Sequence, residues 1–160
     1  MVLTVNPFST TFWVAGKLPY RFQADESAEV LLQRIRQHRV CQIVGPKGSG
    51  KSTLVQCLTN GVRTTDKPLQ FLDGFELLPF WRRYWYRWFG TGCVFIVHKP
   101  LWGVPVVYHT VAEFDIFRRI VAELYPNGFD METLQSVFTK ANGNFRTAFF
   151  DLYDRLTTGN

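Results

Sequence analysis

A glycine-rich run between a short apolar segment and a helix-forming segment constrains the fold of this chain more than any other feature. Residues 40–44 are mostly apolar and predict a buried strand. The run Gly45-Pro46-Lys47-Gly48-Ser49-Gly50-Lys51-Ser52 follows at once. Helix-forming residues continue from Lys51 to the pair Asn60-Gly61, where a helix should end. A strand that passes through a tight glycine loop into a helix is typical of α/β folds.

The spacing of this run also predicts what the loop binds. It matches the pattern G-x-x-x-x-G-K-[ST] at every fixed position. Gly48 and Gly50 can adopt backbone conformations that a side chain would block, so successive N–H groups can point at a phosphate. Lys51 would reach the β- and γ-phosphates, and the Ser52 hydroxyl would bind Mg²⁺. The residues expected to hold the nucleotide are Gly45, Pro46, Lys47, Gly48, Ser49, Gly50, Lys51, Ser52 and Thr53.

Three further apolar runs predict strands at residues 69–72, 93–97 and 104–108. Strands that alternate with helices imply a parallel sheet covered on both faces. Only eight residues lie between Asn60 and Leu69, too few for another strand with its crossover helix. The sequence therefore predicts an α/β fold with a four-stranded, mainly parallel sheet.

The remaining periodic segments predict helices, and the length of 160 residues fits one folding unit. Residues 1–23 mix aromatic and turn-forming residues, which indicates irregular structure or a short hairpin. We expect a single nucleotide-binding domain over residues 1–160, with residues 126–160 as a small, lid-like helical appendage. Besides the helix that starts at Lys51, the predicted helices span residues 26–38, 79–89, 113–124, 131–140 and 145–156.

With these features the chain resembles the P-loop NTPases, and within them the additional-strand class that includes AAA+, STAND and ABC-type ATPases. The run Leu69-Gln70-Phe71-Leu72-Asp73 is similar to a Walker B strand, which presents an aspartate to the magnesium ion. The resemblance implies a three-layer P-loop NTPase fold with the strand order 69–72, 93–97, 40–44, 104–108. It also implies that Ser52 and Asp73 hold Mg²⁺, although an aspartate before Gly74 would suit a solvated turn as well.

The same resemblance implies roles for three more residues. His98 ends the strand 93–97, where this class places a residue that contacts the γ-phosphate or the attacking water. Arg146, in Gly143-Asn144-Phe145-Arg146, resembles the sensor 2 arginine, and a capped helix with an exposed arginine is the alternative. The class carries a glutamate directly after the Walker B aspartate, whereas here Glu76 is the nearest acid. Glu76 would be either the catalytic base or a first-turn acid that favours the next helix. The expected catalytic residues are Lys51, Glu76, His98 and Arg146.

The segment 81–89, Trp-Arg-Arg-Tyr-Trp-Tyr-Arg-Trp-Phe, combines aromatic and basic residues at helical spacing. Trp81, Tyr84, Trp85 and Trp88 share one helix face, which we expect to pack on the sheet while the arginines are solvated. An exposed version of this face would bind single-stranded nucleic acid or a protein partner, including a second copy. A membrane surface is a further, less favoured partner.

Composition bears on the partners and the compartment. The net charge of +5 suits a polyanion, and a nucleotide is itself one. The scattered Cys41, Cys57 and Cys93 predict buried thiols in a reducing compartment. No run is long and apolar enough for a membrane span, and no secretory signal is visible, so we expect a cytoplasmic protein. The absence of a guanine-reading motif favours ATP, with Phe12, Trp13, Tyr20 and Phe22 as candidate adenine contacts.

Three functions fit these observations. The first is a Mg²⁺-dependent ATPase that acts as a switch or as a subunit of a larger machine. The second is a module that senses ATP without hydrolysing it, which would explain the missing glutamate after Asp73. The third is a small-molecule kinase with Asp73 or Glu76 as base for an acceptor hydroxyl.

Overall fold

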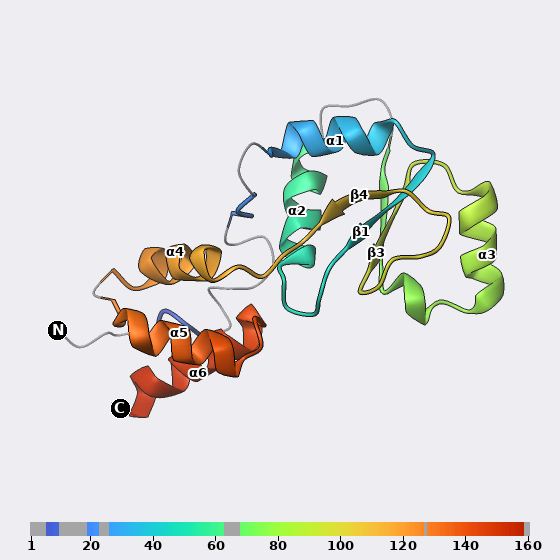
Figure 1. Ribbon diagram of the computed structural model, residues 1–160. Helices are drawn as coiled ribbons and strands as arrows, with labels where there is room; N and C mark the ends of the chain where they lie inside the picture. The colour runs from blue at the N-terminus through green and yellow to red at the C-terminus, as the bar shows by residue number, and fades with distance from the viewer. Residues whose placement is uncertain (1–5, 10–18, 23–25, 63–67, 127, 159–160) are drawn as a thin grey trace.

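Four parallel strands form the centre of the molecule (Figure 1). The computed structural model describes residues 6–9, 19–22, 26–62, 68–126 and 128–158. Within them the strands lie in the order β2-β3-β1-β4, and all three neighbouring pairs are parallel. This confirms the predicted strand order and an α/β fold whose sheet is wholly parallel. The strands are β1 (Val40–Val44), β2 (Gln70–Asp73), β3 (Cys93–Val97) and β4 (Val106–His109).

The two central strands are apolar because both of their faces are covered. Every residue of β3 is buried, and so is every residue of β1 after Val40. Such strands read as continuous Val/Ile-rich runs rather than as alternating ones. Strand β4 begins at Val106 and not at 104, and Pro105 directly precedes it. Proline has no N–H to donate to the sheet, which accounts for the later start.

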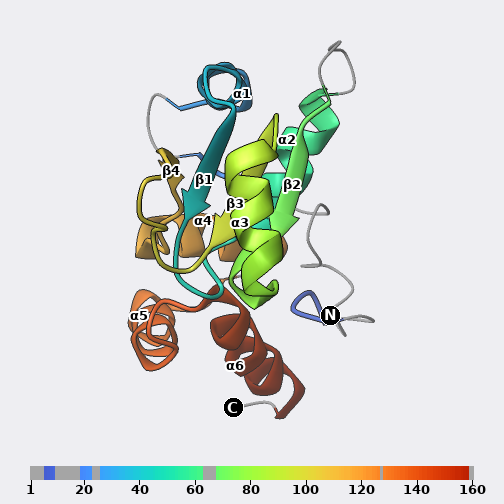
Figure 2. The same ribbon diagram turned by 90° about the vertical axis from the view of Figure 1, so that its right-hand side faces the viewer.

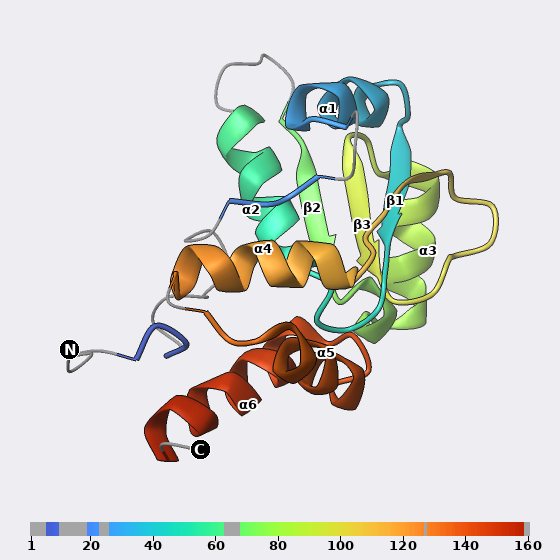
Figure 3. The same cartoon turned by 60° about the vertical axis from the view of Figure 1, so that its left-hand side comes forward.

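Helices cover both faces of the sheet, so the fold has three layers (Figures 2 and 3). On one face, α1 (Ala28–Arg36) and α2 (Lys51–Val62) bury an apolar side against β1, β3 and β4. The Ser27 hydroxyl caps α1 by accepting from the Val30 N–H. On the other face lie the 3₁₀ turn η1 (Phe75–Leu77) and α3 (Phe80–Phe89).

The last three helices share a second hydrophobic core below the sheet (Figure 1). They are α4 (Phe114–Leu124), α5 (Met131–Lys140) and α6 (Phe145–Thr158). Phe8 is fully buried among them and stacks on Phe149 at a centroid distance of 6.1 Å. The helical appendage therefore includes α4 and part of the N-terminal segment, whereas the sequence assigned only residues 126–160 to it.

The prediction that the aromatic face of α3 packs on the sheet is wrong. No residue of α3 is buried, and Trp81, Tyr84, Trp85 and Trp88 are each more than half exposed. The sheet face beside α3 is filled by Phe75, whose ring stacks on Phe95 at 3.9 Å, and by Leu78. From α3 only Tyr86 joins this cluster. Because the turn η1 already covers the sheet, the helix lies outside it with its aromatic face outward.

Two further expectations concern buried cysteine thiols and membrane-spanning helices. Cys41 and Cys93 are buried, Cys57 is half-buried, and all three are free thiols. Burial raises the pKa of the Cys41 thiol to about 12, so it is an unreactive part of the core. Among the described helices, none has the length and apolar content needed to cross a bilayer.

Candidate functional site

The loop between β1 and α2, residues 45–52, has the backbone conformation expected of its glycines. Gly48 and Gly50 have φ values of +80° and +83°, in the left-handed region that side chains disfavour. Gly45 is needed for another reason, because a Cβ there would lie 1.9 Å from Thr110 Oγ1. Thr110 follows β4, is buried, and its hydroxyl lies 2.6 Å from that of Ser49. The loop is thus held against the carboxyl end of the neighbouring strand.

Lys51, the first residue of α2, is only 8% exposed. Its ammonium donates to the carbonyl oxygens of Gly45 at 2.6 Å and Pro46 at 2.7 Å. It also lies 3.1 Å from His98 Nδ1, an atom that is 3.3 Å from the Gly45 carbonyl oxygen as well. An ammonium can only donate, so Nδ1 accepts in a hydrogen bond with Lys51. Burial lowers the pKa of Lys51, while the nearby carboxylates of Asp73 and Glu76 raise it. The lysine is therefore a buried cation with acids close by.

A cavity of about 330 Å³ opens at the carboxyl edge of the sheet, where ligands of open α/β sheets bind. This volume lies at the lower end of the range of roughly 300–1,000 Å³ typical of small-molecule sites. Three segments contribute polar groups: the loop with the start of α2, the ends of β2 and β3, and the start of α6. The expected site residues that line it are Lys47, Gly48, Ser49, Gly50, Lys51, Ser52, Thr53, Asp73, His98 and Arg146.

Glu76 lies beside this cavity rather than on its wall. Asp73 is the last residue of β2, and Gly74 then adopts a left-handed conformation with φ of +66°. This turn starts η1 at once, and the Glu76 carboxylate accepts a hydrogen bond from the backbone N–H of His98. Glu76 therefore connects the ends of β2 and β3 and acts electrostatically on Lys51.

The start of α6 contacts the glycine loop directly. The Phe145 N–H donates to the Gly48 carbonyl at 3.3 Å. The Asn144 side chain caps α6 by accepting from the N–H groups of Arg146 at 3.1 Å and Thr147 at 3.4 Å. Arg146 is exposed and lines the cavity beside this cap. The start of α6 thus contributes to the wall of the cavity.

Sequence reasoning missed most of the apolar wall of the cavity. Ile116 and Ile120 of α4, Phe149 of α6 and Tyr20 line it together with the loop. Tyr20 was expected as an adenine contact, and burial raises the pKa of its phenol. Its ring also lies near Gly50. The sequence predicted a helix over residues 113–124 but did not indicate that Ile116 and Ile120 line a cavity.

The other adenine candidates are placed differently. Phe22 packs against Tyr20 at a centroid distance of 4.9 Å. It joins the core between the sheet and the helices α1 and α2 instead of lining the cavity. Phe12 and Trp13 lie outside the described residues.

The acids of the site form no self-sufficient metal cage. Within the described ranges, no group of three or more His, Cys, Asp or Glu side chains is placed to hold a metal ion. Ser52 and Asp73 nevertheless line the same cavity as the loop. Mg²⁺ commonly takes one or two protein oxygens and completes its shell with phosphate oxygens and water. The two residues therefore fit a magnesium ion that arrives with a phosphate ligand.

Comparison of the chain with protein-family models, with curated proteins and with solved structures finds no match.

Proposed function

We propose that this chain binds ATP with Mg²⁺ in the cavity at the carboxyl edge of the sheet. One observation carries the proposal: a loop with two left-handed glycines, a buried lysine and the first turn of α2 meets Asp73, His98 and Arg146 around one cavity. Backbone N–H groups at a helix start, next to a cation, favour a bound phosphate. The phosphates would draw Lys51 away from the loop carbonyls to which it now donates.

The apolar wall supports a nucleotide rather than a free phosphate ion. Ile116, Ile120 and Phe149, together with the Tyr20 ring, offer an apolar surface for a flat base in the same cavity. In this proposal Ser52 and Asp73 would hold Mg²⁺, which would neutralise the charge that develops on the phosphates. Arg146 neutralises charge on the γ-phosphate.

Hydrolysis is the reaction this arrangement favours. A water oxygen would attack the γ-phosphorus, the bond to the ADP oxygen would break, and Glu76 would take the water proton. For this, the Glu76 carboxylate must release the His98 N–H or use its second oxygen. His98, whose Nδ1 faces Lys51, would carry its ring proton on Nε2 and could donate it to the γ-phosphate.

A second candidate, ATP binding without turnover, is favoured by that same hydrogen bond. Glu76 does not line the cavity, and its carboxylate is already engaged by the His98 backbone. A carboxylate held in this way could change its contact with His98 when ATP binds, but it would not activate a water molecule. The protein would then act as an ATP-dependent switch.

Phosphate release from Mg-ATP, measured together with nucleotide binding, separates the two candidates. Wild type should bind and release phosphate, Lys51→Ala should lose both, and Glu76→Gln should bind without turnover. Lys140→Ala and Glu132→Gln, both on α5 and remote from the cavity, are the matched controls. Binding without phosphate release would leave only the switch, whereas unchanged turnover in Glu76→Gln would exclude this residue as the base.

A further inference from the structure

The helix α3 has its apolar side turned away from the protein. Its six outward aromatic residues range in exposure from 54% at Trp85 to 74% at Phe80. Trp102, on the loop before β4, is 89% exposed and lies next to this helix. We call these seven residues the aromatic patch; its α3 members are Phe80, Trp81, Tyr84, Trp85, Trp88 and Phe89.

The inner side of α3 carries the polar residues that an ordinary surface helix would expose. Arg83, Tyr86 and Arg87 follow the i, i+3, i+4 spacing of one helix side, and all three are half-buried. Arg87 donates to the carbonyl oxygen of Trp102, and its guanidinium lies 5.8 Å from the Trp102 ring centroid. These inward contacts hold the Trp102 loop beside the helix.

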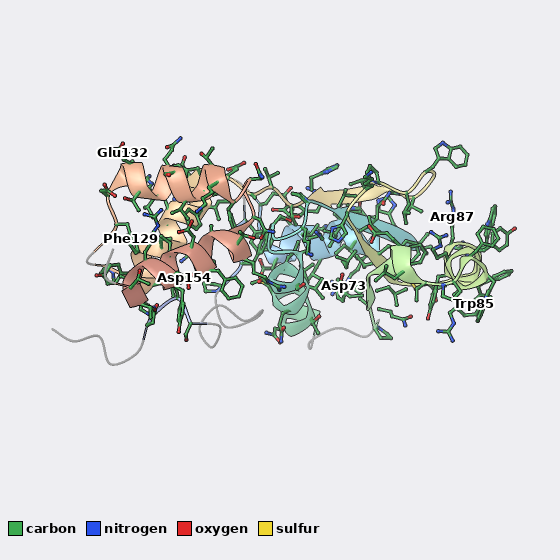
Figure 4. All side chains as sticks on the ribbon, turned by 90° about the horizontal axis from the view of Figure 1, so that it is seen from below. Asp73, Trp85, Arg87, Phe129, Glu132 and Asp154 are labelled. Atoms are coloured by element: carbon green, nitrogen blue, oxygen red, sulfur yellow. The ribbon has the colours of Figure 1, made fainter. Side chains whose placement is uncertain are left out.

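Seven large aromatic side chains, each more than half exposed, indicate a binding surface. Monomeric soluble proteins seldom expose contiguous apolar patches beyond a few hundred Å², and larger ones mark contacts with proteins or membranes. Figure 4 shows Trp85 at one end of the molecule and Glu132 at the opposite end, which the C-terminal helices form. Asp73 of the candidate site lies between these two residues. The patch is thus separate from the nucleotide cavity.

The charges around the patch indicate an anionic partner. From Leu77 to Ala112 the sequence contains no Asp or Glu. Of the four basic side chains in this stretch, Arg83 and Arg87 are half-buried on the inner side of α3, whereas Arg82 and Lys99 are exposed. The exposed acidic and basic side chains of the stretch are therefore all basic, which favours an anionic partner over an uncharged one.

The position of the arginines argues against single-stranded nucleic acid. Proteins that bind single-stranded nucleic acid stack the bases on aromatic rings, and basic side chains along the same groove contact the phosphates. Here Arg83 and Arg87 turn inward, and only Arg82 joins the exposed side, where it lies 5.1 Å from the Trp81 ring. The aromatic residues of the patch other than Trp102 also come from a single helix, α3, which lies at one end of the molecule (Figure 1).

We propose that the aromatic patch docks the protein on the surface of an anionic phospholipid bilayer. Tryptophan and tyrosine rings favour the level of the lipid headgroups, where an apolar ring and a polar edge are both satisfied. An amphipathic helix rich in Trp, Phe and Arg lies in this layer, and basic residues beside it attract anionic lipids. With ten residues, α3 is about 15 Å long, so it lies on the bilayer and does not span it.

Co-sedimentation with vesicles tests this proposal, with tryptophan emission as a second signal. Four of the five tryptophans belong to the patch, so insertion should shift the emission to shorter wavelength. Wild type should bind vesicles of phosphatidylcholine mixed with phosphatidylglycerol, and added salt or pure phosphatidylcholine should weaken binding. The double variant Trp85→Ser/Trp88→Ser should bind these vesicles roughly tenfold or more weakly, since each lost ring removes apolar area from the contact.

Matched variants separate docking from folding and from nucleotide binding. Both substituted tryptophans are exposed, so an unchanged circular dichroism spectrum and melting temperature should accompany the loss. Met131→Ser, an equally exposed apolar residue at the other end, and Lys51→Ala should keep full vesicle binding. The proposal is overturned if wild type stays in the supernatant with anionic vesicles, or if the double variant binds as well as wild type. It is equally overturned if the double variant loses only a dimer seen by sedimentation, or only affinity for oligothymidine.

Discussion

Replacing Gly48 by alanine tests the contact between the glycine loop and the C-terminal helices. At φ of +80°, an alanine costs about 1–2 kcal/mol from the left-handed backbone alone. A Cβ at this position would also lie 2.0 Å from Asn144 Oδ1, the atom that caps α6. Displacing that cap adds about 1 kcal/mol. We expect Gly48→Ala to lower the free energy of unfolding by about 2–3 kcal/mol in total.

A double-mutant cycle isolates the clash. Asn144→Ala alone removes the cap and should cost about 1 kcal/mol. With Asn144 shortened, the new Cβ at position 48 no longer displaces a cap, so the double variant should be no less stable than Gly48→Ala. The two effects would then fall short of additivity by about 1 kcal/mol. Urea unfolding followed by circular dichroism measures all four proteins.

Gly128 provides the matched control, because its φ is +75° and a Cβ there would meet nothing within 4 Å. Gly128→Ala should cost only the backbone term of about 1–2 kcal/mol and should add to Asn144→Ala without coupling. The reasoning is refuted if Gly48→Ala and Gly128→Ala cost the same and both add to Asn144→Ala. The start of α6 would then not touch the loop in solution.

Three further predictions concern the core. Gln42→Leu should lower the free energy of unfolding, measured in urea, by about 3 kcal/mol or more. Gln42 is fully buried and makes three hydrogen bonds to backbone groups of Leu101 and Val104, which a leucine would leave unpaired. A loss under about 1 kcal/mol would contradict this reasoning. Phe8→Ala should cost about 3–5 kcal/mol by calorimetry, whereas no loss would mean that the N-terminal segment does not fill the second core. Iodoacetamide at mildly alkaline pH should alkylate Cys57 before Cys41, because burial raises the pKa of the Cys41 thiol to about 12. Mass spectrometry that showed Cys41 alkylated first would contradict the burial of the Cys41 thiol.

The parts of the fold that local sequence determines could be predicted. The strands β1 and β3 are buried on both faces, so their residues form short runs that are apolar except for Gln42 and that mark the ends of the strands. The glycine spacing gave the loop its left-handed positions at Gly48 and Gly50. Two confirmed features, the four-stranded parallel sheet and the loop backbone, therefore came from short-range patterns. The confirmed strand order was implied by the resemblance and not by these patterns.

Features that depend on distant packing could not be predicted. An aromatic stripe at helical spacing normally faces a core, but η1 had already covered the sheet with Phe75 and Leu78, so α3 turned its stripe outward. The cavity wall likewise joins Tyr20 with Ile116 and Ile120, which lie far apart in the chain. Thr110 was missed as well, and its place just after a parallel strand was the available signal.

Isothermal titration of the purified protein with ATP, with and without Mg²⁺, tests the central claim most directly. The account predicts one saturable site for wild type, tighter with Mg²⁺ than without it, and unchanged in Lys140→Ala. Lys51→Ala should weaken binding by roughly tenfold or more, since a charge-assisted contact of the phosphates is worth about 1.5–3 kcal/mol. Failure of folded wild-type protein to bind ATP or any other nucleoside triphosphate would contradict the account.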